Sequence, residues 1–389
     1  MNKICNKDVC TGCGMCTNLC PVGAISLKVG YNNFLYPDID KKKCIDCGLC
    51  EKKCPVNIKT RNQKNIISTY AVWCKDKNIR KTSTSGGMFT VLADRIIEKG
   101  GIVVGCIWTE DFETKHEIID KKEDLVKLRG SKYVQSETGT IYKRVKQELD
   151  KGRLVLFSGT PCQNHALSIY CGKEYSNLIQ VDMVCHGVPS AHMWSKYINE
   201  INGERKKIVN VFMRYKEKYW DYTFMKVEYE DGTYYKKRTI DDAYFNLFNV
   251  GYSLRESCHH CNYANVYRYG DITLADYWGF KLKSFKMRDY QKGTSLVLVN
   301  SEKGKKLFSE VEKNLVLEKG SLDDAIKGNK CLKEPFCLPT NKVKLFWNDY
   351  NNGASIENLN KKYSENMFKL PRLLFLRRIY HKWMWVLKK

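Results

Sequence analysis

The chain has 389 residues, of which 43% are hydrophobic and 12% aromatic, so it encodes a globular protein large enough for two or three domains. Its 66 Lys and Arg residues outnumber its 43 Asp and Glu residues, which gives a formal net charge of +23. Because no run of about 18 apolar residues or signal-peptide stretch occurs, we expect a cytoplasmic protein. Its eighteen cysteines then favour metal ligands or redox groups over disulfides.

Two four-cysteine runs open the chain. The first is Cys10-x2-Cys13-x2-Cys16-x3-Cys20-Pro21, and the second repeats its spacing as Cys44-x2-Cys47-x2-Cys50-x3-Cys54-Pro55. In such a run three thiolates hold one iron–sulfur cubane while the fourth reaches the other cluster. We therefore expect one [4Fe-4S] cluster on Cys10, Cys13, Cys16 and Cys54, and a second on Cys44, Cys47, Cys50 and Cys20. The stretch resembles a bacterial-type ferredoxin; a structural zinc site is the alternative, but zinc sites seldom use two such runs followed by Pro.

Beyond a polar linker at 57–65, strand-like and helix-like patterns alternate. The apolar runs that predict strands are Ile66–Trp73, Gly101–Trp108, Leu154–Phe157 and Leu178–Val184. The runs that predict helices are Met88–Lys99, Gly139–Lys151 and Cys162–Tyr170. This alternation favours an α/β layer structure with some parallel strands. Later runs predict antiparallel strands with a hairpin turn at Asp231-Gly232. These runs are Val209–Arg214, Thr223–Tyr229 and Thr233–Arg238.

A second group of four cysteines falls in three later segments. Its members are Cys162, Cys185, Cys258 and Cys261. The first two follow predicted parallel strands, at the carboxyl edge where α/β sheets bind ligands. Four thiols on three loops suit one further [4Fe-4S] cluster, whereas buried reduced cysteines, or zinc at Cys258 and Cys261, are the alternatives. The remaining cysteines are assigned no role: Cys5, Cys74, Cys106, Cys171, Cys331 and Cys337.

Six motifs occur in order along the rest of the chain. They are Ser85-Gly-Gly, Arg129-Gly-Ser-Lys-Tyr133, Gly159-Thr-Pro-Cys-Gln163, Cys185-His-Gly-Val-Pro189, Cys258-x2-Cys261 and Asp271-Ile-Thr-Leu-Ala-Asp-Tyr-Trp-Gly279. Together they resemble the family of coenzyme F420 hydrogenase and dehydrogenase beta subunits over roughly residues 1–320. The resemblance implies FAD beside a third [4Fe-4S] cluster on Cys162, Cys185, Cys258 and Cys261. One position departs from the family pattern, since Ala275 stands where the family has glycine.

The resemblance also implies which residues contact the flavin. They are Ser85, Gly86, Gly87, Arg129, Ser131, Lys132, Thr160, Asp276 and Trp278. On the residues alone, the Ser85–Gly87 stretch precedes a predicted helix and can offer backbone N–H groups to a phosphate, although a plain helix cap explains it as well. Arg129 and Lys132 suit a pyrophosphate, against the alternative of two solvated charges.

Two residues are predicted to be catalytic. Lys132 would stabilise a reduced flavin anion, and His186 would donate a proton, although a histidine in such a turn is more often structural. No nicotinamide-binding glycine pattern is present.

The positive net charge indicates which classes of partner the protein could bind. Without a clustered recognition motif we expect no nucleic acid partner, and a basic protein that binds nucleic acid is the weakest interpretation. Acidic redox partners or anionic lipid explain the charge equally well. Residues 368–389 predict a basic amphipathic helix, which would either lie on an anionic membrane surface or dock on protein.

The expected chain is an α+β or α/β multidomain protein. It comprises a ferredoxin-type module at 1–60, two parts of a mixed α/β flavin-binding region at 61–150 and 151–330, and a basic extension at 331–389. The expected function is a flavin-dependent iron–sulfur oxidoreductase that moves electrons between a ferredoxin or partner subunit, its clusters and FAD, with hydride exchange to coenzyme F420 or another organic substrate. The alternative is a non-enzymatic electron-transfer subunit that feeds a separate catalytic chain.

Overall fold

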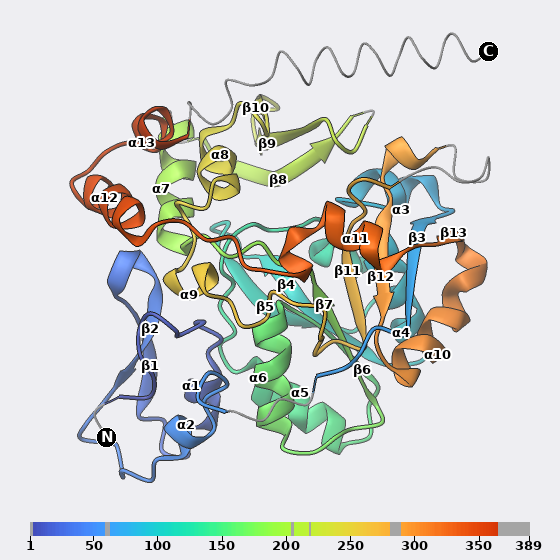
Figure 1. The fold of residues 1–389 in the computed structure, drawn as a ribbon, viewed down its shortest axis with the longest axis horizontal. Helices are drawn as coiled ribbons and strands as arrows, with labels where there is room; N and C mark the ends of the chain where they lie inside the picture. The colour runs from blue at the N-terminus through green and yellow to red at the C-terminus, as the bar shows by residue number, and fades with distance from the viewer. Residues whose placement is uncertain (1–2, 59–62, 204–205, 218, 281–288, 365–389) are drawn as a thin grey trace.

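A mixed eight-stranded sheet forms the centre of the molecule (Figure 1). The structure, a computed structural model, describes residues 3–58, 63–203, 206–217, 219–280 and 289–364. The strands of this sheet are β3 (Ser68–Cys74), β4 (Ile102–Trp108), β5 (Thr114–Ile119), β6 (Val155–Ser158), β7 (Leu178–Met183), β11 (Ile272–Asp276), β12 (Ser295–Val299) and β13 (Leu315–Lys319). Their order is β13-β3-β12-β11-β7-β6-β4-β5.

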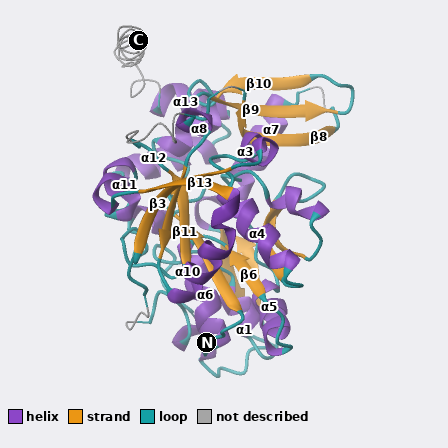
Figure 2. Ribbon diagram, turned by 90° about the vertical axis from the view of Figure 1, so that its right-hand side faces the viewer, coloured by secondary structure: helices purple, strands orange, loops and turns teal. Residues whose placement is uncertain are grey.

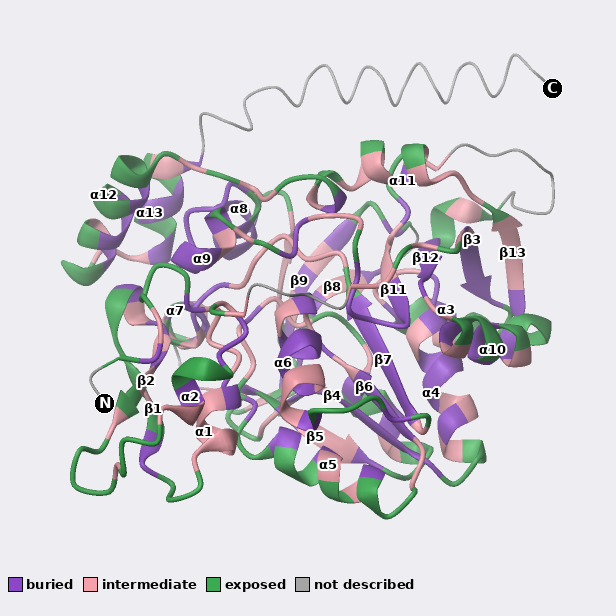
Figure 3. Ribbon diagram, turned by 60° about the horizontal axis from the view of Figure 1, so that its bottom comes forward, coloured by how far each residue is buried: buried purple, intermediate pink, exposed green. Residues whose placement is uncertain are grey.

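The middle of this sheet is parallel, as the sequence predicts. Strands β4, β6, β7 and β11 pair in parallel, whereas β12, β3, β13 and β5 add antiparallel edges. The run Ile102–Val104 is fully buried, because helices cover both faces of the sheet (Figure 3). The carboxyl ends of the parallel strands therefore meet at one edge, where β6 leads to Cys162 and β7 to Cys185.

Helices flank the sheet on both sides (Figure 2). They are α3 (Lys77–Thr82), α4 (Met88–Glu98), α5 (Ile141–Asp150), α6 (Pro161–Cys171), α10 (Glu302–Val311) and α11 (Leu322–Gly328). Leu92 of α4 packs with Val103, whereas Tyr142 of α5 and Leu167 of α6 pack with Val104 on the opposite face. Successive strand residues thus point to opposite layers, and each helix buries one apolar stripe.

The N-terminal module has two similar halves. It contains α1 (Met15–Leu19), β1 (Ile25–Val29), β2 (Leu35–Ile39) and α2 (Leu49–Lys52), with β1 and β2 antiparallel. Gly14 and Gly48 precede the two short helices with φ angles of 72° and 69°, a conformation that glycine adopts without strain. The repeat of the cysteine runs in sequence is therefore also a repeat of the backbone.

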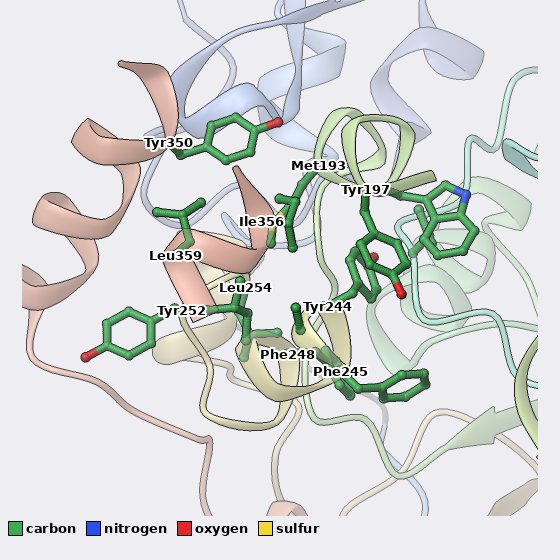
Figure 4. Packing of buried hydrophobic residues seen from close by; sticks show 14 of the residues in the cluster. Met193, Tyr197, Tyr244, Phe245, Phe248, Tyr252, Leu254, Tyr350, Ile356 and Leu359 are labelled. Carbon is green, nitrogen blue, oxygen red and sulfur yellow. The ribbon is translucent and has the colours of Figure 1, made fainter. Parts of the chain in front are cut away.

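The predicted antiparallel strands form a separate small sheet, and their hairpin turn lies at Gly232 with a φ angle of 81°. Its strands are β8 (Ile208–Lys216), β9 (Thr223–Tyr229) and β10 (Tyr234–Arg238). The helices grouped near it are α7 (Ala191–Ile201), α8 (Ala243–Asn249), α9 (Glu256–His259), α12 (Thr340–Asn351) and α13 (Ile356–Tyr363). Figure 4 shows their shared core, in which Met193, Tyr244 and Ile356 are fully buried.

The predicted basic helix at 368–389 lies outside the described residues. Within the described ranges, none of the helices has the length and apolar character needed to cross a bilayer.

Asp242 provides a pH-dependent contribution to stability. Its buried carboxylate caps α8 by accepting a bond from the Phe245 N–H at 3.0 Å, and it accepts one from the Tyr197 hydroxyl at 2.5 Å. Burial raises its pKa to about 6 despite these bonds. Because the folded state binds this proton more tightly than the unfolded chain, the contribution of Asp242 falls as the pH rises from about 4 to about 6, by about 3 kcal/mol in total.

We expect the substitution Asp242→Asn to remove this pH dependence, since the amide oxygen still caps the helix. Denaturant unfolding between pH 4.5 and pH 7 measures the difference from the unmodified protein. The neighbouring exposed Asp241 gives the matched control, because Asp241→Asn leaves the buried carboxylate in place. An unchanged pH dependence in Asp242→Asn would contradict the assignment.

Candidate redox centre

The ferredoxin-type module encloses two hollows lined by thiols. The first, about 350 Å³ including its open mouth, is lined by Cys20, Cys44, Cys47 and Cys50. The second, about 400 Å³, is lined by Cys10, Cys13, Cys16 and Cys54, together with Cys5. Each hollow takes three thiols from one cysteine run and one from the other, and their linings are almost wholly apolar. We refer to these as the outer set (Cys20, Cys44, Cys47, Cys50) and the inner set (Cys10, Cys13, Cys16, Cys54). Four thiols around an apolar hollow fit a [4Fe-4S] cubane.

The thiols of the inner set are more deeply buried than those of the outer set. Burial raises the pKa of Cys13 to about 12, whereas a hydrogen bond from Cys5 and the charge of Arg255 lower the pKa of Cys10 against the effect of burial. Thiolates rather than thiols bind metal, so ligand binding must supply the free energy that deprotonates Cys13. Cys5 contacts this hollow although its place in the sequence predicted no role for it.

The four later cysteines are neighbours in the structure although they come from three loops. Cys162 opens α6, Cys185 follows β7, and Cys258 and Cys261 lie on and just after α9. The Cys162 Sγ lies 3.0 Å from the Thr160 Oγ1, and the Tyr263 N–H donates to the Cys261 Sγ at 3.4 Å. Burial raises the pKa of Cys162 and Cys185, and nearby thiols of the group raise both further. We call this group the third set.

This third set lacks the arrangement of a single-ion site. Among the residues that the structure describes, no three His, Cys, Asp or Glu side chains are placed to bind one metal ion. A cubane is larger than a single ion and takes its four thiolates at its corners, so the third set fits a cluster by its donor chemistry.

The inner and third sets are neighbours. Cys13 contributes to the raised pKa of Cys162, after burial and the charge of Cys261. The hydroxyl of the buried Tyr142 donates to the Cys13 carbonyl at 2.8 Å, and burial, Cys13 and Cys162 raise its pKa. Helix α1 of the module lies beside α6 of the sheet layer (Figure 1). The three sets thus form a series that leads from the module into the sheet edge.

The two loops predicted to bind flavin also lie side by side. The Ser131 N–H donates to the Thr84 hydroxyl at 2.8 Å, and the Arg129 guanidinium donates to the Thr82 hydroxyl at 2.8 Å. Gly86 is packed so tightly that a Cβ there would lie 2.4 Å from the Val72 carbonyl oxygen. The loop at 82–87 is therefore fixed by β3 and β12 rather than free.

Asp276 and Trp278 lie at the same edge, next to cations that no sequence pattern marked. Asp276 forms an ion pair with Arg214, and the Trp278 ring lies 5.6 Å from the same guanidinium. Lys216 is buried and donates to the Ser85 carbonyl at 2.8 Å. Burial and the charges of Arg80 and Arg214 lower its pKa to about 7.

Three cations, Arg80, Arg214 and Lys216, lie close together at this edge, and carboxylates near them are Asp276 and Asp289. Buried cations are normally paired with anions, so an anionic group such as a phosphate fits the site. No sequence signal distinguished these three cations among 66 Lys and Arg residues.

The two predicted catalytic residues, Lys132 and His186, lie in different surroundings. The Lys132 Nζ donates to the carbonyls of Lys127 at 3.1 Å and Gly130 at 3.3 Å, and burial lowers its pKa. The His186 ring packs against Phe248 and Phe336, and one of its nitrogens lies 3.2 Å from the Phe248 carbonyl oxygen.

Lys132 thus belongs to one of the two predicted flavin loops, whereas no contact in the described ranges joins His186 to the loops at 82–87 and 129–132. Thr160 lies with the third set, through Cys162.

One segment connects the loops that are predicted to bind flavin with the thiols. After Ser131, the Tyr133 hydroxyl accepts a bond from Arg214 at 3.2 Å. The Gln135 amide then donates to the Thr11 carbonyl at 3.3 Å and to the Gly12 carbonyl at 3.2 Å in the module. Residues 129–136 therefore span the distance from the predicted flavin loops to the inner set.

Comparisons with known proteins match both parts of this arrangement. The 4Fe-4S dicluster domain matches residues 9–58, and the N-terminal and C-terminal parts of the coenzyme F420 hydrogenase/dehydrogenase beta subunit match residues 69–143 and 152–325. One subunit of the F(420)H(2) dehydrogenase of Methanosarcina mazei is 24% identical over 292 residues, which cover 71% of this chain and 79% of that protein. A chain of the F420-reducing [NiFe] hydrogenase complex from Methanosarcina barkeri matches 76% of this chain and 93% of its own length, with 18% identity and a TM-score of 0.45.

The two beta-subunit matches together cover more than half of the sequence, and they contain the third set and both predicted flavin loops. The expected resemblance is therefore confirmed, and the chain belongs to the family of coenzyme F420 hydrogenase/dehydrogenase beta subunits and carries a 4Fe-4S dicluster domain.

Proposed function

We propose that this protein is an iron–sulfur flavoprotein oxidoreductase that moves electrons between three [4Fe-4S] clusters and FAD and exchanges a hydride with coenzyme F420 or another organic substrate. The observation that carries this proposal is the series of three four-thiol sets leading from the ferredoxin-type module to the sheet edge. The clusters would pass single electrons, and the flavin would pair them.

Different residues of the chain would receive the electrons and fix the spacing between the sets of this series. The outer set includes the exposed Cys47, so a ferredoxin or partner subunit would deliver electrons there. Tyr142 and Thr138 fix the backbone at Cys13 through hydrogen bonds of 2.8 Å and 3.1 Å, which holds the inner set against the third. Residues that fix this spacing keep the path short, and electron transfer depends steeply on distance.

The flavin would be held by the loops at 82–87 and 129–132. Backbone N–H groups at Ser85 and Gly87 would face a phosphate at the start of α4, near the cations Arg80 and Lys216. Gly86 would hold this loop in place, since its N–H donates to the Ser295 hydroxyl at 3.0 Å. Lys132 would stabilise negative charge on the reduced ring. Trp278, Asp276, Arg129, Ser131 and Thr160 would shape the pocket, and His186 would serve as a proton donor.

The partner side of the proposal rests on the relatives and on charge. A relative named as a subunit of an F(420)H(2) dehydrogenase supports a larger complex and coenzyme F420 as the hydride partner. The same name also favours the second candidate function, an electron-transfer subunit that feeds a separate catalytic chain. A peripheral position on an anionic membrane rests on the sequence of 368–389 alone.

Iron and flavin content separates the two candidate functions. Protein purified without oxygen should contain about twelve iron atoms and one FAD per chain, with a visible spectrum of both groups. About eight iron atoms without flavin would contradict the flavoenzyme and favour the electron-transfer subunit.

A further inference from the structure

Arg255 is a fully buried cation without a carboxylate partner. Its side chain is 0% exposed, and it donates to the Cys10 carbonyl at 2.6 Å, the Gln135 side-chain oxygen at 3.0 Å and the Leu35 carbonyl at 3.0 Å. All three acceptors are neutral, and among the described residues no Asp or Glu forms an ion pair with it, including its neighbour Glu256. A buried charge without compensation is strongly destabilising, so this site requires a nearby anion.

The position of Arg255 identifies which anions can supply that charge. Its side chain enters the ferredoxin-type module, where the guanidinium lies 4.2 Å from the Tyr36 ring centre and 5.3 Å from that of Phe34. Its backbone belongs to the third set, since the Cys258 N–H donates to the Arg255 carbonyl at 2.9 Å and the Arg255 N–H donates to Val188 at 3.0 Å. One residue therefore contacts the backbone of both the inner and the third set.

The packing around Arg255 is specific to a guanidinium. Gly12 is needed for its approach, because a Cβ at Gly12 would lie 2.7 Å from the Arg255 Nη1. Three N–H donors point to three fixed oxygens, while the flat faces lie near aromatic rings. The guanidinium is thus held in one position by these contacts, from which its charge acts on the Cys10 and Cys258 thiols.

We infer that Arg255 is a positioning residue whose charge compensates the inner and third clusters and raises the reduction potential of both. The inference rests on the proposed function. Each cluster gains one negative charge when it takes up one electron from the donor, and the thiolate ligands already make the oxidised cluster anionic. A fixed cation nearby stabilises the reduced form more than the oxidised form, because Coulomb attraction grows with the charge.

The test is a redox titration of the holoprotein followed by electron paramagnetic resonance. In Arg255→Gln, which removes the charge but retains hydrogen bonding, the equilibrium constant for reducing the inner cluster should fall about tenfold, equivalent to about 59 mV for one electron. Arg255→Lys keeps the charge and should keep the potential near that of the unmodified protein. Lys28→Gln is the control and should leave the potential unchanged, since Lys28 lies in the same module but is exposed and pairs with Asp38 at 2.7 Å.

The outcomes separate this inference from the proposed function. Full iron content with an unchanged inner potential in Arg255→Gln would overturn the inference and leave the proposed function standing. Equal losses in Arg255→Lys and Arg255→Gln would show that hydrogen bonds rather than charge set the potential, and would also overturn it. Missing clusters in the unmodified protein would instead contradict the proposed function.

A second variant covers the case in which Arg255→Gln does not fold. Gln135→Glu leaves Arg255 in place and sets a carboxylate where Gln135 now accepts from its Nη1 at 3.0 Å. Because the new carboxylate offsets the positive charge of the Arg255 guanidinium, the reduction potential of the inner cluster should again fall. An unchanged potential in Gln135→Glu would overturn the role assigned to the charge of Arg255.

Discussion

Replacing Cys162 with serine should remove about four of about twelve iron atoms per chain and lower turnover with a ferredoxin-type donor roughly 100-fold, while flavin stays bound. Cys162 opens α6 at the carboxyl end of β6, where it faces both the other thiols of the third set and Cys13 of the inner set. Its loss would break the series between the module and the flavin loops. Iron analysis, the visible spectrum and turnover with a one-electron donor measure the three parts of this expectation.

Helix α6 also supplies the matched control for this experiment. Cys171 is a buried thiol at the other end of the same helix, where it packs in the apolar layer with Tyr175 and Leu178. Cys171→Ser should leave the iron content and turnover unchanged, although it places a hydroxyl in that layer. If Cys162→Ser retained all of its iron, the third cluster would not use Cys162, and the proposed electron path would need another entry to the sheet.

The elements of the fold followed from local patterns in the sequence. The runs at Leu154–Phe157 and Leu178–Val184 predict β6 and β7 within one residue at each end, because a strand covered on both faces leaves an uninterrupted apolar run. The crossed thiol sets were expected because the fourth cysteine of such a run ligates the other cluster in two-cluster ferredoxins, and each hollow is lined by three thiols of one run and one of the other.

Contacts across the fold could not be predicted in this way. Arg255, Lys216 and Arg214 are three of 66 basic residues, and only the packed structure separates a buried cation from the solvated ones. Thr160 stays a predicted flavin residue, and its motif did not indicate that its hydroxyl lies 3.0 Å from the Cys162 Sγ. Burial and charge compensation depend on residues far apart in sequence, and no spacing rule records them.

Replacing Lys132 with alanine should lower flavin-dependent turnover roughly 100-fold without loss of iron. The Lys132 ammonium group is held over its own loop by the carbonyls of Lys127 and Gly130, and burial lowers its pKa. A positive charge fixed beside a flavin ring would stabilise the reduced anion. Removing it should lower the flavin reduction potential, which a spectroscopic titration measures independently of turnover.

Two further variants distinguish this charge from a structural effect of the loop. Lys132→Arg retains the charge and should restore most of the flavin potential, whereas a loop that depends on the lysine's own hydrogen bonds would not recover. Lys127→Ala removes an exposed lysine of the same loop that pairs with Asp124 at 2.7 Å, and it should leave the flavin unchanged. Normal turnover and an unshifted flavin potential in Lys132→Ala would place this lysine away from the ring, and would leave Arg129 and Ser131 as the only flavin contacts proposed for that loop.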